Sequence, residues 1–97
     1  MTDRYEDMTP DGTGTVGTTQ AQALPRRPGR GKLRIENTHG SNVLYVGSDA
    51  NVTSSAYSEA VAAGEKINLD GYVGPVHVVG SGAGTTYVVT EVYTDLT

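Results

Sequence analysis

The sequence TTYVVTEVYT, at residues 85–94, predicts the longest β-strand of the chain. Valine, threonine and tyrosine favour strands, and successive side chains of a strand point to opposite faces. Tyr87, Val89, Glu91 and Tyr93 therefore share one face of this strand.

Five shorter segments with strand character precede residue 85, separated by turns rich in glycine, asparagine and serine. They are residues 32–36, 43–46, 52–53, 66–70 and 76–79. Residues 54–64 are irregular and allow a single helical turn, which Gly64 would end. Short strands at this spacing predict an all-β fold, a small antiparallel β-sandwich or barrel.

The composition changes near residue 31. Residues 1–31 are rich in glycine, threonine and proline, and residues 9–19 show no apolar periodicity. Such a segment cannot bury enough apolar surface to offset the entropy of ordering it. We therefore expect two parts: an extended, intrinsically flexible N-terminal arm over residues 1–31 and a β-sandwich or barrel domain over residues 32–97.

The composition also limits how so small a domain is stabilised. The chain has 97 residues and contains no cysteine, phenylalanine or tryptophan. A domain of about 60 residues buries only about 60% of the surface that its unfolded chain exposes. Without disulfides, such domains commonly depend on a metal or on oligomerisation. We therefore expect a homo-oligomer, or a domain that docks on a larger surface.

Charge and hydropathy exclude several classes of function. The formal net charge is −4 at pH 7 and comes from residues 32–97, whereas nucleic-acid binding draws on many lysine and arginine contacts to phosphate. The N-terminus has no apolar run of the kind found in secretory signals. No stretch approaches the roughly 20 apolar residues of a membrane span. We expect a soluble protein made in the cytoplasm, with neither nucleic acid nor membrane as partner.

The arm supplies candidate contacts to a partner protein, because extended tails dock through backbone hydrogen bonds and a few pocketed side chains. The apolar anchors would be Tyr5, Met8, Val16 and Leu24, and the basic contacts would be Arg26, Arg27 and Arg30. In this interpretation the arginines meet an acidic patch on the partner. In the alternative interpretation they belong to a solvated linker held open by two prolines.

The sequence contains no convincing catalytic apparatus, and we expect no enzyme activity, no cofactor and no metal. His39 and His77 are the only histidines and lack the spacing of a metal site. Residues 80–84 form a glycine-rich loop without the Gly-Lys-Ser/Thr ending of a phosphate loop. Tyr57 and Tyr72 are candidates for an interface or for stacking on a sugar, although half-buried tyrosines of a sheet would show the same pattern.

Several landmarks follow one another along residues 33–93. They are Ile35 and Asn37, an apolar strand from Val43 to Gly47, Val52-Thr53, and Gly64-Glu65 before the alternating Ile67 and Leu69. In this succession the chain resembles small virion proteins of tailed bacteriophages, and among them it is most like capsid decoration (cement) proteins.

The resemblance implies a structural role rather than catalysis. It implies that the β-domain lies over junctions between capsomers, with the arm laid on the shell and the major capsid protein as partner. It also implies a homotrimer on the capsid exterior of the virion, after synthesis in the host cytoplasm. Fibre and tail accessory proteins use similar domains. A carbohydrate- or cell-surface-binding module is therefore the alternative function.

Overall fold

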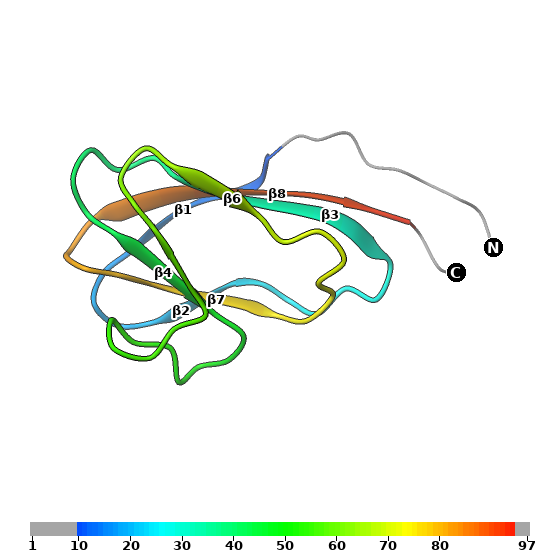
Figure 1. Ribbon diagram of the computed structural model, residues 1–97, viewed down its shortest axis with the longest axis horizontal. Helices are drawn as coiled ribbons and strands as arrows, with labels where there is room; N and C mark the ends of the chain where they lie inside the picture. The colour runs from blue at the N-terminus through cyan, green and yellow to red at the C-terminus, as the bar shows by residue number, and fades with distance from the viewer. Residues whose placement is uncertain (1–9, 95–97) are drawn as a thin grey trace.

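The structure, a computed structural model, describes residues 10–94 and is all-β, with two antiparallel sheets packed face to face (Figure 1). The first sheet has the strand order β1 (Pro10–Val16), β8 (Thr85–Tyr93), β3 (Arg30–Asn37) and β6 (Lys66–Asn68). The second has the order β2 (Ala21–Leu24), β7 (Val76–Gly80), β4 (Leu44–Gly47) and β5 (Glu59–Val61). The predicted small antiparallel β-sandwich is confirmed.

The core lies between the two sheets and is built almost entirely from aliphatic side chains. On β8, Tyr87 and Val89, which the alternation places on the same face, point into the core. The buried aliphatic residues on the neighbouring strands are Leu33, Ile35, Leu44, Val46, Val61, Val76 and Val78. Full burial of one such side chain stabilises the fold by roughly 1.5–3 kcal/mol, so these short strands depend on packing between the sheets.

The predicted boundary at residue 31 differs from the structure. Residues 10–16 form β1, which pairs with β8, and residues 21–24 form β2, which pairs with β7. The described part of the expected arm therefore supplies one edge strand to each sheet. The physical reason is that an edge strand needs few apolar residues, because its partner strand provides the hydrogen bonds and its neighbours provide the core.

Two further predictions are corrected. The irregular stretch at residues 54–64 contains no helical turn; it contains the short strand β5, which pairs with β4. Residues 52–53 form no regular strand, and Thr53 makes only an isolated bridge to Ala56. Val52 is nevertheless buried. Packing against the core therefore fixes this loop without extending the sheet.

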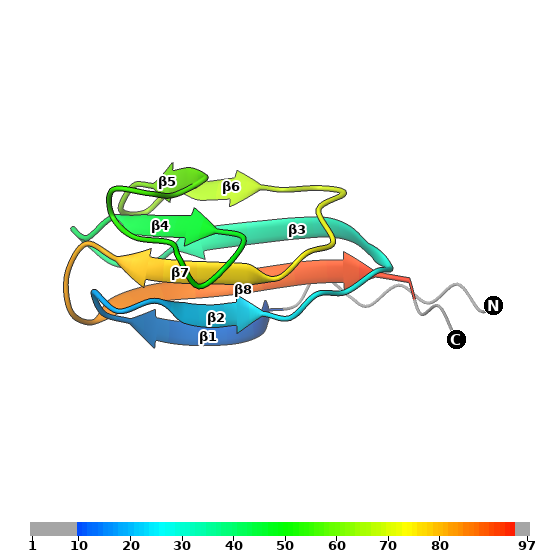
Figure 2. The same cartoon turned by 90° about the horizontal axis from the view of Figure 1, so that it is seen from below.

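The edge strands of the two sheets lie above one another on both sides of the sandwich. Figure 2 shows β1 and β2 along one side, and β5 and β6 along the opposite side. The strands β5 and β6 are only three residues long, so on their side the sheets are joined mainly by loops.

Candidate functional site

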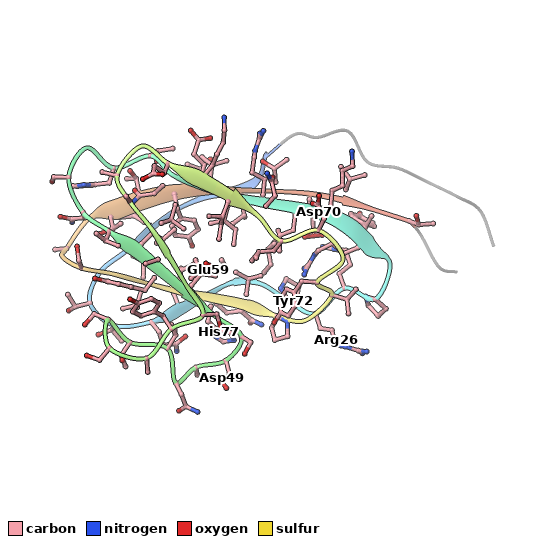
Figure 3. All side chains as sticks on the ribbon, in the orientation of Figure 1. Arg26, Asp49, Glu59, Asp70, Tyr72 and His77 are labelled. Atoms are coloured by element: carbon pink, nitrogen blue, oxygen red, sulfur yellow. The ribbon has the colours of Figure 1, made fainter. Side chains whose placement is uncertain are left out.

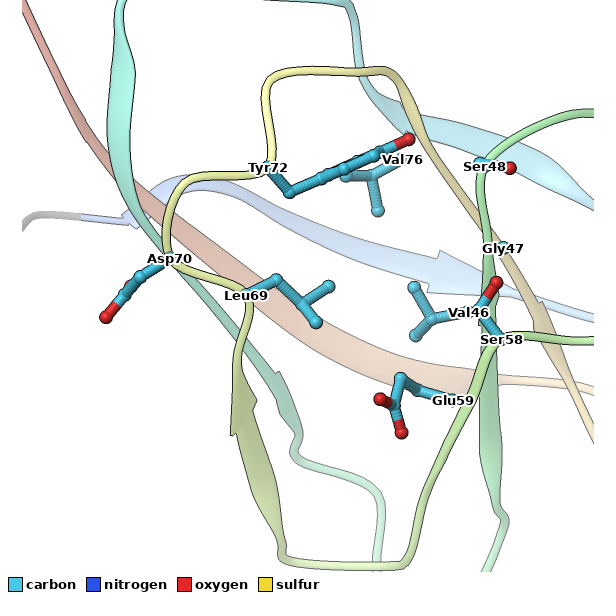
Figure 4. A pocket seen from close by; sticks show the side chains of 9 residues that line it. All are labelled: Val46, Gly47, Ser48, Ser58, Glu59, Leu69, Asp70, Tyr72 and Val76. Carbon is cyan, nitrogen blue, oxygen red and sulfur yellow. The ribbon is translucent and has the colours of Figure 1, made fainter.

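A pocket of about 250 Å³ opens between the two sheets beside β5 and β6 (Figure 4). Its walls come from the end of β4, the start of β5 and the connection between β6 and β7. The lining residues are Val46, Gly47, Ser48, Ser58, Glu59, Leu69, Asp70, Tyr72 and Val76. The pocket lies where β5 begins, at Glu59, and just beyond the end of β6, at Leu69.

The walls of this pocket are mainly apolar and are held in place. Val46 and Leu69 point toward each other across it, and the ring of Tyr72 lies along one side (Figure 4). The Tyr72 hydroxyl donates a hydrogen bond of 2.6 Å to the carbonyl of Pro75. The ring also packs directly on the backbone of Gly74, where a side chain would collide with it. These contacts preorganise the aromatic wall.

Two acidic residues, Glu59 and Asp70, line the same pocket, and their carboxylates point in different directions. The Asp70 carboxylate points away from the pocket (Figure 4) and accepts a hydrogen bond of 3.2 Å from the Leu33 amide. The Glu59 side chain is exposed and points into the space between Leu69 and Ser58. Within residues 10–94 no ion pair involves Glu59. The pocket therefore combines apolar walls with one carboxylate that is free to meet a cation.

A second, shallower pocket of about 210 Å³ adjoins the first and contains Tyr57. Tyr57 is 47% exposed, and its ring lies 4.8 Å from that of Tyr45, measured between centroids, at an interplanar angle of 45°. Asp49 and Asn51 also line this pocket. Of the two tyrosines singled out in the sequence, each therefore lines a different pocket.

The predicted basic contacts divide between the surface and the interior. Arg26 is exposed (Figure 3). The side chain of Arg30 is completely buried, with Nη2 3.4 Å from Oε2 of Glu91. The Nε of Arg27 pairs with Oε1 of Glu91, and its guanidinium lies 4.2 Å from the ring centroid of Tyr93. Two of the three arginines are thus occupied within the domain rather than presented to a partner.

The predicted apolar anchors also require correction. Val16 and Leu24 are 4% and 5% exposed and belong to the hydrophobic core. They cannot reach a partner's pocket while β1 and β2 stay paired, because their burial is part of the sandwich. Tyr5 and Met8 lie outside the described residues.

The histidines serve local structure in the described part of the chain. The Nδ1 of His39 accepts hydrogen bonds from the amides of Ser41 and Asn42, at 3.0 and 2.9 Å. The Nδ1 of His77 lies 2.8 Å from the amide oxygen of Gln20. Among residues 10–94 no three acidic or histidine side chains come together as a metal site would require. This stretch also contains no helix capable of crossing a membrane.

Asn37, a landmark of the resemblance, is completely buried at the end of β3. Its side-chain amide donates to the carbonyls of Asn42 and Val61, at 2.8 and 2.9 Å. Its side-chain oxygen accepts a hydrogen bond of 2.9 Å from the amide of His39. Asn37 thereby joins the β3–β4 connection to the end of β5, so its role is structural.

One side of the sandwich is free of charge over a long stretch of chain. Residues 12–24, which include most of β1 and all of β2, contain no charged residue. Thr13, Thr15 and Gln22 are exposed there. Proteins commonly protect sheet edges from pairing with other chains by placing charges on them. This pair of uncharged edges, which we call the β1–β2 side, was missed in the sequence because edge position depends on pairing between distant segments.

No protein-family model matches the chain, and a search of curated proteins gave no significant match.

Proposed function

We propose that the protein is a structural virion component, a decoration protein that binds the major capsid protein on the exterior of a tailed-phage capsid and stabilises the shell. The observation that carries the proposal is the β1–β2 side. It presents two stacked sheet edges over residues 12–24 without one charged side chain. In a free protein, an uncharged sheet edge promotes pairing with other chains and aggregation. In an assembly, the same edge can form the contact with a partner.

Strand addition is the docking mode that such an edge favours. The outer edge of β1 has backbone donors and acceptors that no other strand of residues 10–94 pairs with. A strand of the partner could satisfy these groups in register, as in other complexes formed by strand addition. The residues before Pro10 join the chain at this same edge, so contacts of Tyr5 and Met8 would extend the interface. Of the three arginines predicted to contact a partner, Arg26 is the one that does not pair with Glu91.

The class of partner comes from the resemblance of residues 33–93 to small virion proteins. Many copies on a symmetric shell add their weak contacts together, so avidity replaces a single strong interaction. The stability of a single sandwich comes from the apolar core between its two sheets. Association into trimers would add to this stability and is tested by the molar mass of the protein in solution.

The direct test is co-sedimentation of the purified full-length protein with capsids that lack it. We expect saturable binding at a fixed ratio to the capsid protein. A chain lacking residues 1–9 should keep its fold. It should still bind capsids, because the β1–β2 side remains, but more weakly, because the contacts of Tyr5 and Met8 are lost. A chain lacking residues 1–31 is no test of the arm, because it loses β1 and β2. A folded full-length protein that stays in the supernatant at all capsid concentrations would refute the proposal.

A second candidate function is carbohydrate binding, which one observation favours. The exposed ring of Tyr57 lines a pocket together with Asp49 and Asn51, and an exposed tyrosine beside polar groups suits stacking on a sugar. Screening the full-length protein on a glycan array tests it, with Tyr57→Ala as the binding-deficient variant. Glycan binding that Tyr57→Ala abolishes, together with no capsid binding, would replace the first function by this one.

A further inference from the structure

We infer that the 250 Å³ pocket beside β5 and β6 binds the side chain of a lysine from a partner protein, with the alkyl stem between Leu69 and Tyr72 and the ammonium against Glu59. The inference rests on the proposed function only in one respect, namely that the partner protein carrying the lysine is the capsid protein. The pocket itself can be tested without any capsid.

The size of the pocket sets the size of its occupant. Pockets for drug-sized ligands measure roughly 300–1,000 Å³, and a dry cavity of about 150 Å³ accepts benzene. A pocket of about 250 Å³ therefore has room for one extended side chain rather than for a nucleotide or an oligosaccharide. Four of its lining residues, Ser48, Ser58, Glu59 and Asp70, are exposed, so a chain that approaches from outside can reach it.

The walls select a stem that is apolar. Val46, Leu69, Val76 and the ring of Tyr72 form most of the lining, and Tyr72 is fixed by its hydrogen bond to Pro75. Lysine buries a four-carbon stem on apolar surface while its charged end stays near water. A sugar would instead require several convergent polar groups, whereas here the polar groups lie at the edge of the pocket.

The charge of the rim selects a cation. Glu59 points into the pocket, no basic residue lines it, and Asp70 adds a second negative charge nearby although its carboxylate is turned away. The ring face of Tyr72 also attracts a cation. One carboxylate can pair with either lysine or arginine, so the choice of lysine rests on the apolar walls, which suit its stem of four methylene groups better than the three of arginine.

The experiment is an NMR titration of the full-length, ¹⁵N-labelled protein with n-butylammonium, which has the stem and charge of a lysine side chain. Butyrate and n-butanol serve as anionic and neutral probes with a similar stem. We expect saturable shifts confined to the amides of Val46, Ser58, Glu59, Leu69 and Tyr72, with a dissociation constant of the order of 1–10 mM. Butyrate should produce no saturable shift at these amides, and n-butanol should bind more weakly.

Two variants test whether the carboxylate of Glu59 binds the ammonium group. Glu59→Gln should weaken butylammonium binding about two- to fivefold, as expected for an exposed ion pair. The matched control is Glu65→Gln, which removes an exposed carboxylate outside the pocket and should leave the affinity unchanged. Shifts spread over the whole surface, equal binding of butyrate, or equal effects of the two variants would overturn the inference. None of these results would alter capsid co-sedimentation, so the two proposals fail separately.

Discussion

Arg30 and Glu91 form an ion pair in which neither side chain is exposed to solvent, with Nη2 and Oε2 3.4 Å apart. The guanidinium of Arg30 also donates to the carbonyls of Pro25, Tyr72 and Gly74, at 2.9, 3.2 and 2.8 Å. The pair therefore ties β3 and β8 to the loops that follow β2 and β6. Through Arg30, this pair holds the loop at residues 69–75, which forms one wall of the 250 Å³ pocket.

Glu91→Gln is expected to lower the free energy of unfolding by about 3–5 kcal/mol, because it leaves the buried Arg30 without its counter-charge. Urea denaturation measures this loss. The control is Arg26→Gln at an exposed position, with an expected change within about 0.5 kcal/mol. Equal stability of Glu91→Gln and the control would show that the ion pair contributes nothing to the fold.

Gly14→Ala is expected to destabilise the protein by about 1–3 kcal/mol, because the added methyl group would collide with the ring of Tyr87. Gly17→Ala is the matched control, since nothing lies within 4 Å of a side chain at that position. The control should be neutral or slightly stabilising. Thermal unfolding of the two variants also tests whether β1 is part of the sandwich. Identical melting temperatures would indicate that β1 is detached in solution.

Asn37→Ala is expected to cost about 2–4 kcal/mol, because it leaves the carbonyl of Val61 and two further backbone groups without their partner. Asn68→Ala, at an exposed position on β6, serves as the control and should change stability by less than about 0.5 kcal/mol. Chemical denaturation compares the two. If Asn37→Ala were as stable as the control, Asn37 would not be the residue that joins the β3–β4 connection to β5.

Burial raises the pKa of Tyr87 above its ordinary value of 10.0. As pH rises through 10, the unfolded chain loses this proton while the folded chain keeps it, so stability falls until the folded pKa is reached. The slope contributed by Tyr87 is at most about 1.4 kcal/mol per pH unit. Urea midpoints on either side of pH 10 should fall less steeply for Tyr87→Phe than for the unaltered protein. If the urea midpoints of the two proteins fell equally with pH, the pKa of Tyr87 would not be raised by folding.

The sandwich could be predicted because apolar and polar residues alternate along β3, and β8 has the valine, threonine and tyrosine content of a strand. The sequence did not predict β1, because Gly14 is needed there only to admit the ring of Tyr87, which lies far along the chain. The alternation of β8 already placed Glu91 on the same face as Tyr87 and Val89. Its buried partner could not be recognised, since the contact joins residues 61 positions apart.

The candidate sites were predicted less completely than the fold. Tyr72 and Tyr57 were singled out as aromatic residues, and each lines a pocket. Glu59 and Leu69 were missed, because only the crossing of the β6–β7 connection brings them together. The role of Arg26 and of the β1–β2 side in binding a capsid stays a prediction.

The most direct test of the central claim places charges on the β1–β2 side. Thr13→Lys/Thr15→Lys changes two exposed residues of β1, and lysine on an edge strand blocks strand addition without disturbing the core. The matched control, Thr53→Lys/Ser55→Lys, adds the same charge to an exposed loop. Co-sedimentation with capsids should be lost for the first variant and retained for the second. Capsid binding of the first variant at the level of the unaltered protein would contradict the account.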